Sequence, residues 1–211
     1  MRAFGRDIGD GLRFVWAHPV IRPLTLLGFG LSFTGGGVLG LLVVYAVDVA
    51  GVALRGLPIG ALFATSAVGG VVGSLLVPWL GRRFDAARIS LVAYSTNAFA
   101  LLVVVAVTGF VPALLALTCW YVTFSLAIVN GIGTRARLTP LSMQSRVNAA
   151  GRMIAWGGQP FGAICAGVIA EAHGVRLALL LCGAGIGATV VLGWLSPLRH
   201  GIPDHAGSPA P

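Results

Sequence analysis

Apolar residues in this chain occur in long, nearly uninterrupted runs, and short clusters of arginine separate the runs. A helix that crosses a bilayer needs about 20 mostly apolar residues, because each residue advances about 1.5 Å through a hydrocarbon core of about 30 Å. Six stretches meet this requirement, at residues 23–47, 57–80, 89–107, 111–132, 147–170 and 176–195. The pattern predicts an all-α integral membrane protein in which residues 23–199 form a bundle of six transmembrane helices.

The two ends of the chain lack such runs. In residues 1–22, apolar side chains repeat at spacings of three to four, at Phe4, Ile8, Leu12 and Val15 or Trp16. This period predicts an amphipathic helix on the cytoplasmic membrane surface, and the alternative is a solvated lead-in to the first span. Two aspartates interrupt the segment, so it is not expected to be a signal peptide. Residues 200–211 are rich in Pro and Gly and are predicted to form a disordered cytoplasmic tail.

The arginines predict the orientation of the bundle. All 14 basic residues are arginine, and eleven of them fall on one side of the six spans. Two others, Arg55 and Arg176, fall on the opposite side, and Arg152 lies within the fifth span. Because positively charged loops stay in the cytoplasm, both termini are expected to be cytoplasmic, in the inner (plasma) membrane of a bacterium. The clusters also alternate with spans and do not form one basic face, so nucleic acid is not an expected partner, whereas membrane lipids are.

Composition agrees with this prediction. Hydrophobic residues make up 57% of the chain and charged residues only 9%, against about 25% charged in soluble domains. The 31 glycines fit a membrane bundle, where small residues let helix backbones approach closely. The three cysteines lie in apolar runs and the four histidines are scattered, and hydrolase and phosphate-loop motifs are missing. We therefore expect a protein that is not an enzyme and uses no cofactor or metal ion.

Three segments carry a resemblance to a known family. They are DIGDGLRFVWAHPVIRPL at 7–24, GSLLVPWLGRRFDAAR at 73–88 and SRVNAAGRMIAWGGQPFGAICAG at 145–167. In this order and spacing, they resemble the carboxy-terminal six-helix half of a major facilitator superfamily transporter, nearest to drug- and macrolide-efflux-like permeases. The resemblance implies a permease that exports small molecules by alternating access, with the substrate held between two six-helix halves. A second half, from another chain or from a second copy, is therefore an expected partner.

The turn between the second and third spans contains Gly81, Arg82, Arg83 and Asp85. The resemblance implies that such residues latch the transporter closed on the cytoplasmic side, since arginines near helix C-termini are stabilised by the helix dipole. The alternative is a plain anchor on anionic lipid headgroups.

The middle of the fifth span contains Gly158, Gln159, Pro160 and Gly162. Pro160 lacks an N–H group and predicts a local bend or break, and interrupted helices at the membrane midplane often mark a transport site. Gly158 and Gly162 also match a small-xxx-small packing face, so packing is the alternative interpretation. Gln159 is then a candidate for substrate contact. Arg152, nearer the cytoplasmic end, is an intramembrane charge whose favoured interpretation is snorkelling to the interface.

Further cavity candidates come from the family resemblance, in which the corresponding helices line the central cavity. They are Tyr121, Ser125 and Asn130 in the fourth span and Thr34 in the first. No acidic residue falls inside a span, so proton coupling would have to come from the other half. The alternatives to a half transporter are a non-transporting membrane scaffold, an inert truncated fragment, and a homodimeric six-helix transporter. The substrate is not predicted.

Overall fold

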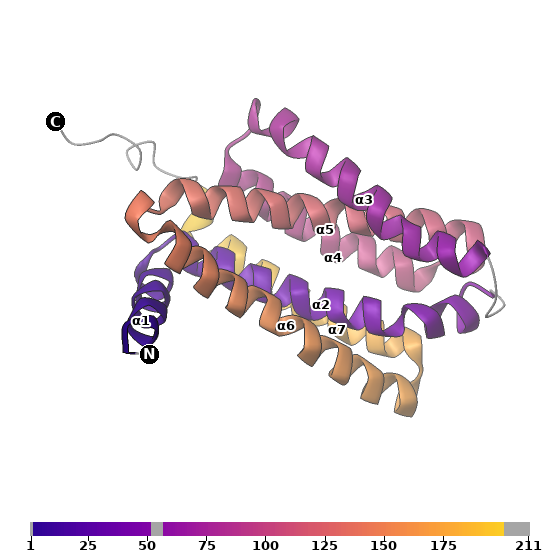
Figure 1. Cartoon of the computed structure of the whole chain (residues 1–211). Helices are drawn as coiled ribbons and strands as arrows, with labels where there is room; N and C mark the ends of the chain where they lie inside the picture. Colours follow the sequence, from indigo (N-terminus) through magenta and orange to yellow (C-terminus); the bar gives the residue numbers. More distant parts are fainter. Residues whose placement is uncertain (1, 52–56, 201–211) are drawn as a thin grey trace.

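The computed structural model describes residues 2–51 and 57–200, and over these residues every regular element is a helix (Figure 1). Arg55 and the tail predicted as disordered lie outside the described residues, except for His200 at its start. The long helices are α1 (Arg2–Ala17), α2 (Ile21–Asp48), α3 (Leu57–Gly81), α4 (Ala86–Ala106), α5 (Phe110–Leu138), α6 (Gln144–His173) and α7 (Val175–Leu195). Two short 3₁₀ helices, η1 (Leu141–Met143) and η2 (Pro197–His200), precede α6 and follow α7.

Six of these helices, α2 to α7, are long and apolar enough to cross a membrane. The predicted fold class, an all-α protein with six candidate membrane spans, is confirmed. The largest difference in bounds is at α5, which continues to Leu138 and not only to residue 132. Arginine is a good helix former, so Arg135 and Arg137 continue the helix beyond the apolar run. The helix ends where Pro140 disfavours a helical conformation at Thr139.

The spans pack in two groups, one of α2, α6 and α7 and one of α3, α4 and α5 (Figure 1). Helix α2 lies along α6, and α3 lies along α5, while α7 packs against both α2 and α4. The arginine-rich turns α3–α4 and α5–α6 lie at the same end of the bundle as α1 (Figure 1). Helices α3 and α6 bury the smallest shares of their residues, so each leaves a broad face uncovered by the chain itself.

Glycine makes the contact between α2 and α6 unusually close. A Cβ atom on Gly36 would overlap the carbonyl oxygen of Gln159, and one on Gly162 would overlap the carbonyl oxygen of Phe33. A Cβ atom on Gly158 would lie 2.6 Å from the carbonyl oxygen of Phe29. The two backbones therefore touch directly, which is how small residues stabilise helix pairs in membranes, where apolar side chains gain nothing by leaving lipid.

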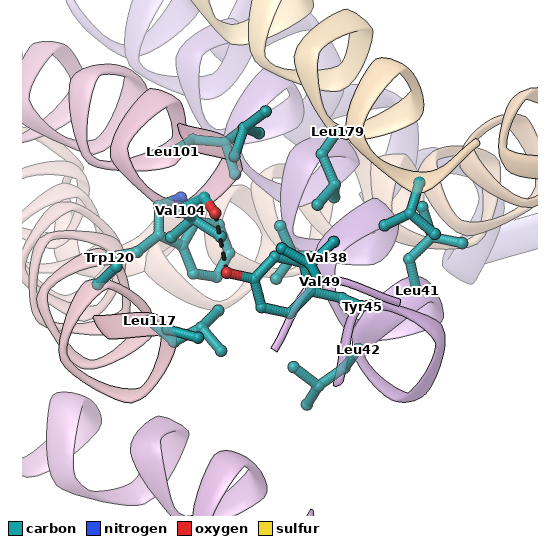
Figure 2. Close-up of a cluster of buried hydrophobic side chains, with 14 of the residues drawn as sticks. Val38, Leu41, Leu42, Tyr45, Val49, Leu101, Val104, Leu117, Trp120 and Leu179 are labelled. Carbon is teal, nitrogen blue, oxygen red and sulfur yellow. Dashed lines mark hydrogen bonds between the residues drawn. The ribbon is translucent and has the colours of Figure 1, made fainter. Parts of the chain in front are cut away.

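The largest buried cluster lies where α2, α4, α5 and α7 meet (Figure 2). Tyr45 and Trp120 are its largest fully buried side chains, with Leu42, Leu101 and Leu179 around them. The Tyr45 hydroxyl donates a hydrogen bond of 2.8 Å to the carbonyl oxygen of Val104 in α4, the dashed line in Figure 2. This bond joins the two groups of helices at the end of the bundle opposite α1.

Helix α1 packs against the start of α6. A Cβ atom on Gly11 would lie 2.6 Å from the carbonyl oxygen of Arg146, and Val15 is buried beside Val147 and Ala150. Trp16 is half exposed, with the Arg22 guanidinium 5.5 Å from the centre of its ring. The predicted amphipathic segment is thus a helix, and part of its apolar face packs against the bundle. The side chains of Phe4 and Ile8 lie outside the described part.

Candidate functional site

A cavity of about 500 Å³ opens at the arginine-rich end, between α3, α4 and α5. It brings the predicted gating turn between α3 and α4 together with a predicted cavity residue of α5. Gly81 and Arg82 come from the α3–α4 turn, Asn130 and Arg137 come from α5, and Phe84 forms part of the apolar wall. Its charged lining is cationic, so this end of the bundle is suited to anionic groups.

Local chemistry orders the α3–α4 turn. The Asp85 carboxylate accepts a hydrogen bond of 2.9 Å from the backbone N–H of Ala87 and so caps the N-terminus of α4. The Arg83 guanidinium stacks 4.7 Å from the centre of the Trp79 ring, one turn earlier on α3. In the described chain, the partner of Arg83 is therefore an aromatic ring on the preceding helix and not a carboxylate.

Three of the predicted cavity residues form hydrogen bonds between helices. The Thr34 hydroxyl donates to the carbonyl oxygen of Gly30 or of Cys182 in α7, at 3.0 and 3.1 Å. Ser125 bonds to Gly70 and Ser74 of α3, at 3.0 and 3.2 Å. Buried Asn130 donates through Nδ2 to two acceptors in α4, the Ala86 carbonyl oxygen and Ser90 Oγ, both at 2.8 Å. These side chains hold neighbouring spans together.

The remaining candidate on α5 is an aromatic residue. Tyr121 is half-buried, its ring packs edge-on against Trp120 at 4.9 Å, and its backbone lies under Gly69 of α3. It thus belongs to the α3–α5 contact.

The middle of α6 presents one polar side chain outward. The helix runs without interruption through Pro160, and Gly158 and Gly162 face α2. Gln159 is exposed and makes no hydrogen bond to a described residue. Two turns nearer the start of α6, Arg152 is exposed and stacks over Trp156, with 4.9 Å from its guanidinium to the ring centre.

The predicted fourth span, 111–132, ends before Arg135, whereas the helix in the structure includes it. Arg135 lies inside α5 and is only 5% exposed. Its guanidinium lies on the backbone of α6 at Gly151, where any Cβ atom would overlap Nη1. The sequence signal for this burial is a glycine, Gly151, that faces the charge of Arg135, but the sequence does not show that these two positions meet.

Six apolar helices, glycine-tight packing and a cationic end define a multi-pass membrane bundle, which fits the six-helix half of a major facilitator transporter. A family model supports the same class: the transmembrane secretion effector family matches residues 2–208. The chain belongs to this family. Its membership points to a transporter and not to an enzyme, and comparison with curated proteins finds no match.

Proposed function

We propose that the chain is one six-helix half of a permease that exports small molecules by alternating access from a bacterial cytoplasm, paired with a second six-helix half. The observation that carries this proposal is Gln159. Its amide is exposed near the middle of a 30-residue span, without a hydrogen-bond partner in the described chain. A primary amide facing hydrocarbon without a partner costs several kcal/mol (about 2–7). The face of α6 that holds Gln159 is therefore suited to an aqueous pathway or another protein surface.

The uncovered faces of α3 and α6 support pairing with a second bundle. Exposed side chains on these helices include Val71, Leu75, Phe161, Ile164 and Val168. These apolar residues can contact either lipid or protein. The polar Gln159, exposed on α6 as well, is therefore what favours a protein partner. Membrane lipids would cover the rest of the surface.

The proposed orientation places α1 and the arginine-rich turns in the cytoplasm. Every arginine cluster of the described chain is at that end, as expected if positive loops stay inside. Export then begins at the end where Arg82 and Arg137 line a cavity.

An export assay tests the proposal. The chain is expressed in an efflux-deficient bacterium alone, with the neighbouring coding region, and as that region alone, and efflux of a panel of amphipathic dyes is followed by fluorescence. We expect efflux that needs both products. Gln159→Leu should reduce the rate at least about tenfold if a hydrogen bond to the pathway is lost, since about 1.4 kcal/mol corresponds to a factor of ten. Val168→Leu, an apolar change on an exposed position of the same helix, is the matched control.

The outcomes separate the alternatives. Efflux by this chain alone, with specific cross-links between two copies, supports a homodimer. Normal membrane insertion without efflux in any combination contradicts transport and leaves a scaffold or an inert fragment. In an active pair, loss of efflux in Arg83→Ala with normal insertion supports a gating latch, and altered insertion supports a lipid anchor.

A further inference from the structure

Arg135 is a buried cation with no counter-ion in the described chain. Its Nε and Nη1 atoms are buried and have no hydrogen-bond partner, and no described carboxylate lies within ion-pair distance. The described aspartates at the same end are engaged elsewhere: Asp85 caps α4, and Asp10 lies 3.9 Å from Arg146. An uncompensated buried charge costs several kcal/mol, so this guanidinium is expected to have a partner in the working protein.

Glycines and a tyrosine hydroxyl lie near Arg135. The hydroxyl of Tyr94 in α4, a residue that is 2% exposed, lies beside Gly131, one turn before Arg135 on α5. Glycines from two other helices surround the Tyr94 hydroxyl: a Cβ atom would lie 3.9 Å from it on Gly28 and 3.7 Å on Gly131. With Gly151 beneath the guanidinium, three glycines on α2, α5 and α6 keep side chains away from these two polar groups.

We propose that Arg135 and Tyr94 form a binding site for a single carboxylate. The planar guanidinium offers two parallel N–H donors that match the two oxygens of a carboxylate, and the tyrosine hydroxyl is a further donor. One positive charge in the low-dielectric interior is neutralised by one negative charge, which favours a monocarboxylate over a doubly charged phosphate. The carboxylate belongs either to a small-molecule substrate or to an acidic side chain of a second polypeptide.

The place of the site suggests its role. Arg135 lies in the last turn of α5, at the arginine-rich end of the bundle and away from the level of Gln159. If the proposed function and orientation hold, this is where a substrate enters from the cytoplasm, and the substrates are monocarboxylates. This assignment of the substrate class rests on the proposed function, whereas binding of a carboxylate to the chain does not.

Binding is tested on the full chain in lipid nanodiscs that hold one chain each. The probe is benzoate, and the neutral benzamide controls for partition into lipid. Wild-type chain should broaden the ¹³C resonance of labelled benzoate. At about ten times its Kd, benzoate should raise the melting temperature by about 3–6 °C. Arg135→Gln should abolish both effects, and Tyr94→Phe should weaken them. Arg176→Gln, a change at an exposed arginine at the opposite end of the bundle, should behave as wild type.

A second readout separates a binding role from a structural one. Without benzoate, Arg135→Gln should melt at or above the wild-type temperature, because an uncompensated charge is removed. A lower melting temperature together with no benzoate response in wild type overturns the proposal, and so does an equal response in Arg135→Gln. If discs with two chains, or complexes from native membranes, lose the response that single chains show, a protein side chain supplies the carboxylate. If all forms respond, the ligand is a free molecule. Failure of export leaves this binding result unchanged, so the two proposals fail separately.

Discussion

Replacing Gly162 by alanine should separate α2 from α6. The added Cβ atom would overlap the carbonyl oxygen of Phe33 and lie 2.6 Å from its carbonyl carbon. Ordinary contacts of a Cβ atom begin at 3.4 Å, and the clashing atoms are backbone, which cannot rotate away. The helices must therefore move apart by about 1 Å, and a gap of that size forfeits up to about half of each dispersion contact along the interface.

The expected destabilisation follows from overpacking a close contact. Such changes typically cost about 1–3 kcal/mol, which for a chain of this length lowers the melting temperature by about 2–12 °C. The matched control is Gly167→Ala, the same chemical change five residues later on the same helix. Gly167 is exposed and has nothing within 4 Å of the added atom, so its stability should stay unchanged or rise slightly, because alanine is the better helix former.

Both variants are melted in the same detergent, with tryptophan fluorescence as the signal. Fluorescence is sensitive here because Trp120 is fully buried in the core that α2 shares with α5. If Gly162→Ala and Gly167→Ala melt within about 1 °C of each other, the close backbone contact does not stabilise the bundle and the reasoning is wrong.

Other side chains give predictions of the same kind. Tyr45→Phe removes the hydrogen bond to Val104 and should cost about 0.5–1.5 kcal/mol in melting experiments, whereas Tyr121→Phe, whose hydroxyl has no such bond, should not. Asn130→Ala removes both bonds to α4 and should cost more than either tyrosine change, about 1–3 kcal/mol; equal costs would contradict the packing role. Burial lowers the pKa of His18, whose Nδ1 accepts from the N–H groups of Val20 and Ile21. The unfolded chain thus binds more protons between that lowered pKa and 6.5, so stability should fall as pH drops through this window. His18→Gln should remove this dependence and exposed His173→Gln should keep it.

The spans were predictable from sequence because each depends on a local property. A run such as 23–47 is apolar over its whole length, and hydrophobic thickness alone sets how long it must be. The end of α5 was not predictable in this way. An apolar run ends at its last apolar residue, whereas a helix continues until a residue disfavours the helical conformation, here near Pro140. Hydropathy therefore predicts which residues lie in the membrane and not where a helix ends.

The candidate site was less predictable, because polar residues in a span have two uses. Thr34, Ser125 and Asn130 have the chemistry of cavity residues, but each finds an acceptor on a neighbouring helix. A polar residue that lines a cavity and one that bonds to a neighbouring helix look the same in sequence. The rotation of the helix about its axis decides which of the two occurs. Arg135 shows the opposite case: the apolar run ends before it, but the approach of Gly151 allows it to be buried inside α5.

The seam between α5 and α6 is a sparse contact at the bundle's arginine-rich end. Helices α2 and α6 touch backbone to backbone through Gly36, Gly158 and Gly162, so separating them would break many close contacts. Helices α5 and α6 contact each other little, and what lies between them is the unpaired guanidinium of Arg135 against Gly151. Opening that seam breaks few apolar contacts and exposes a charge that gains hydration, so the two changes offset each other. Opening the α5–α6 seam is therefore expected to cost less than separating α2 from α6, and a carboxylate bound at the proposed site on Arg135 would remove the gain in hydration and favour the closed seam.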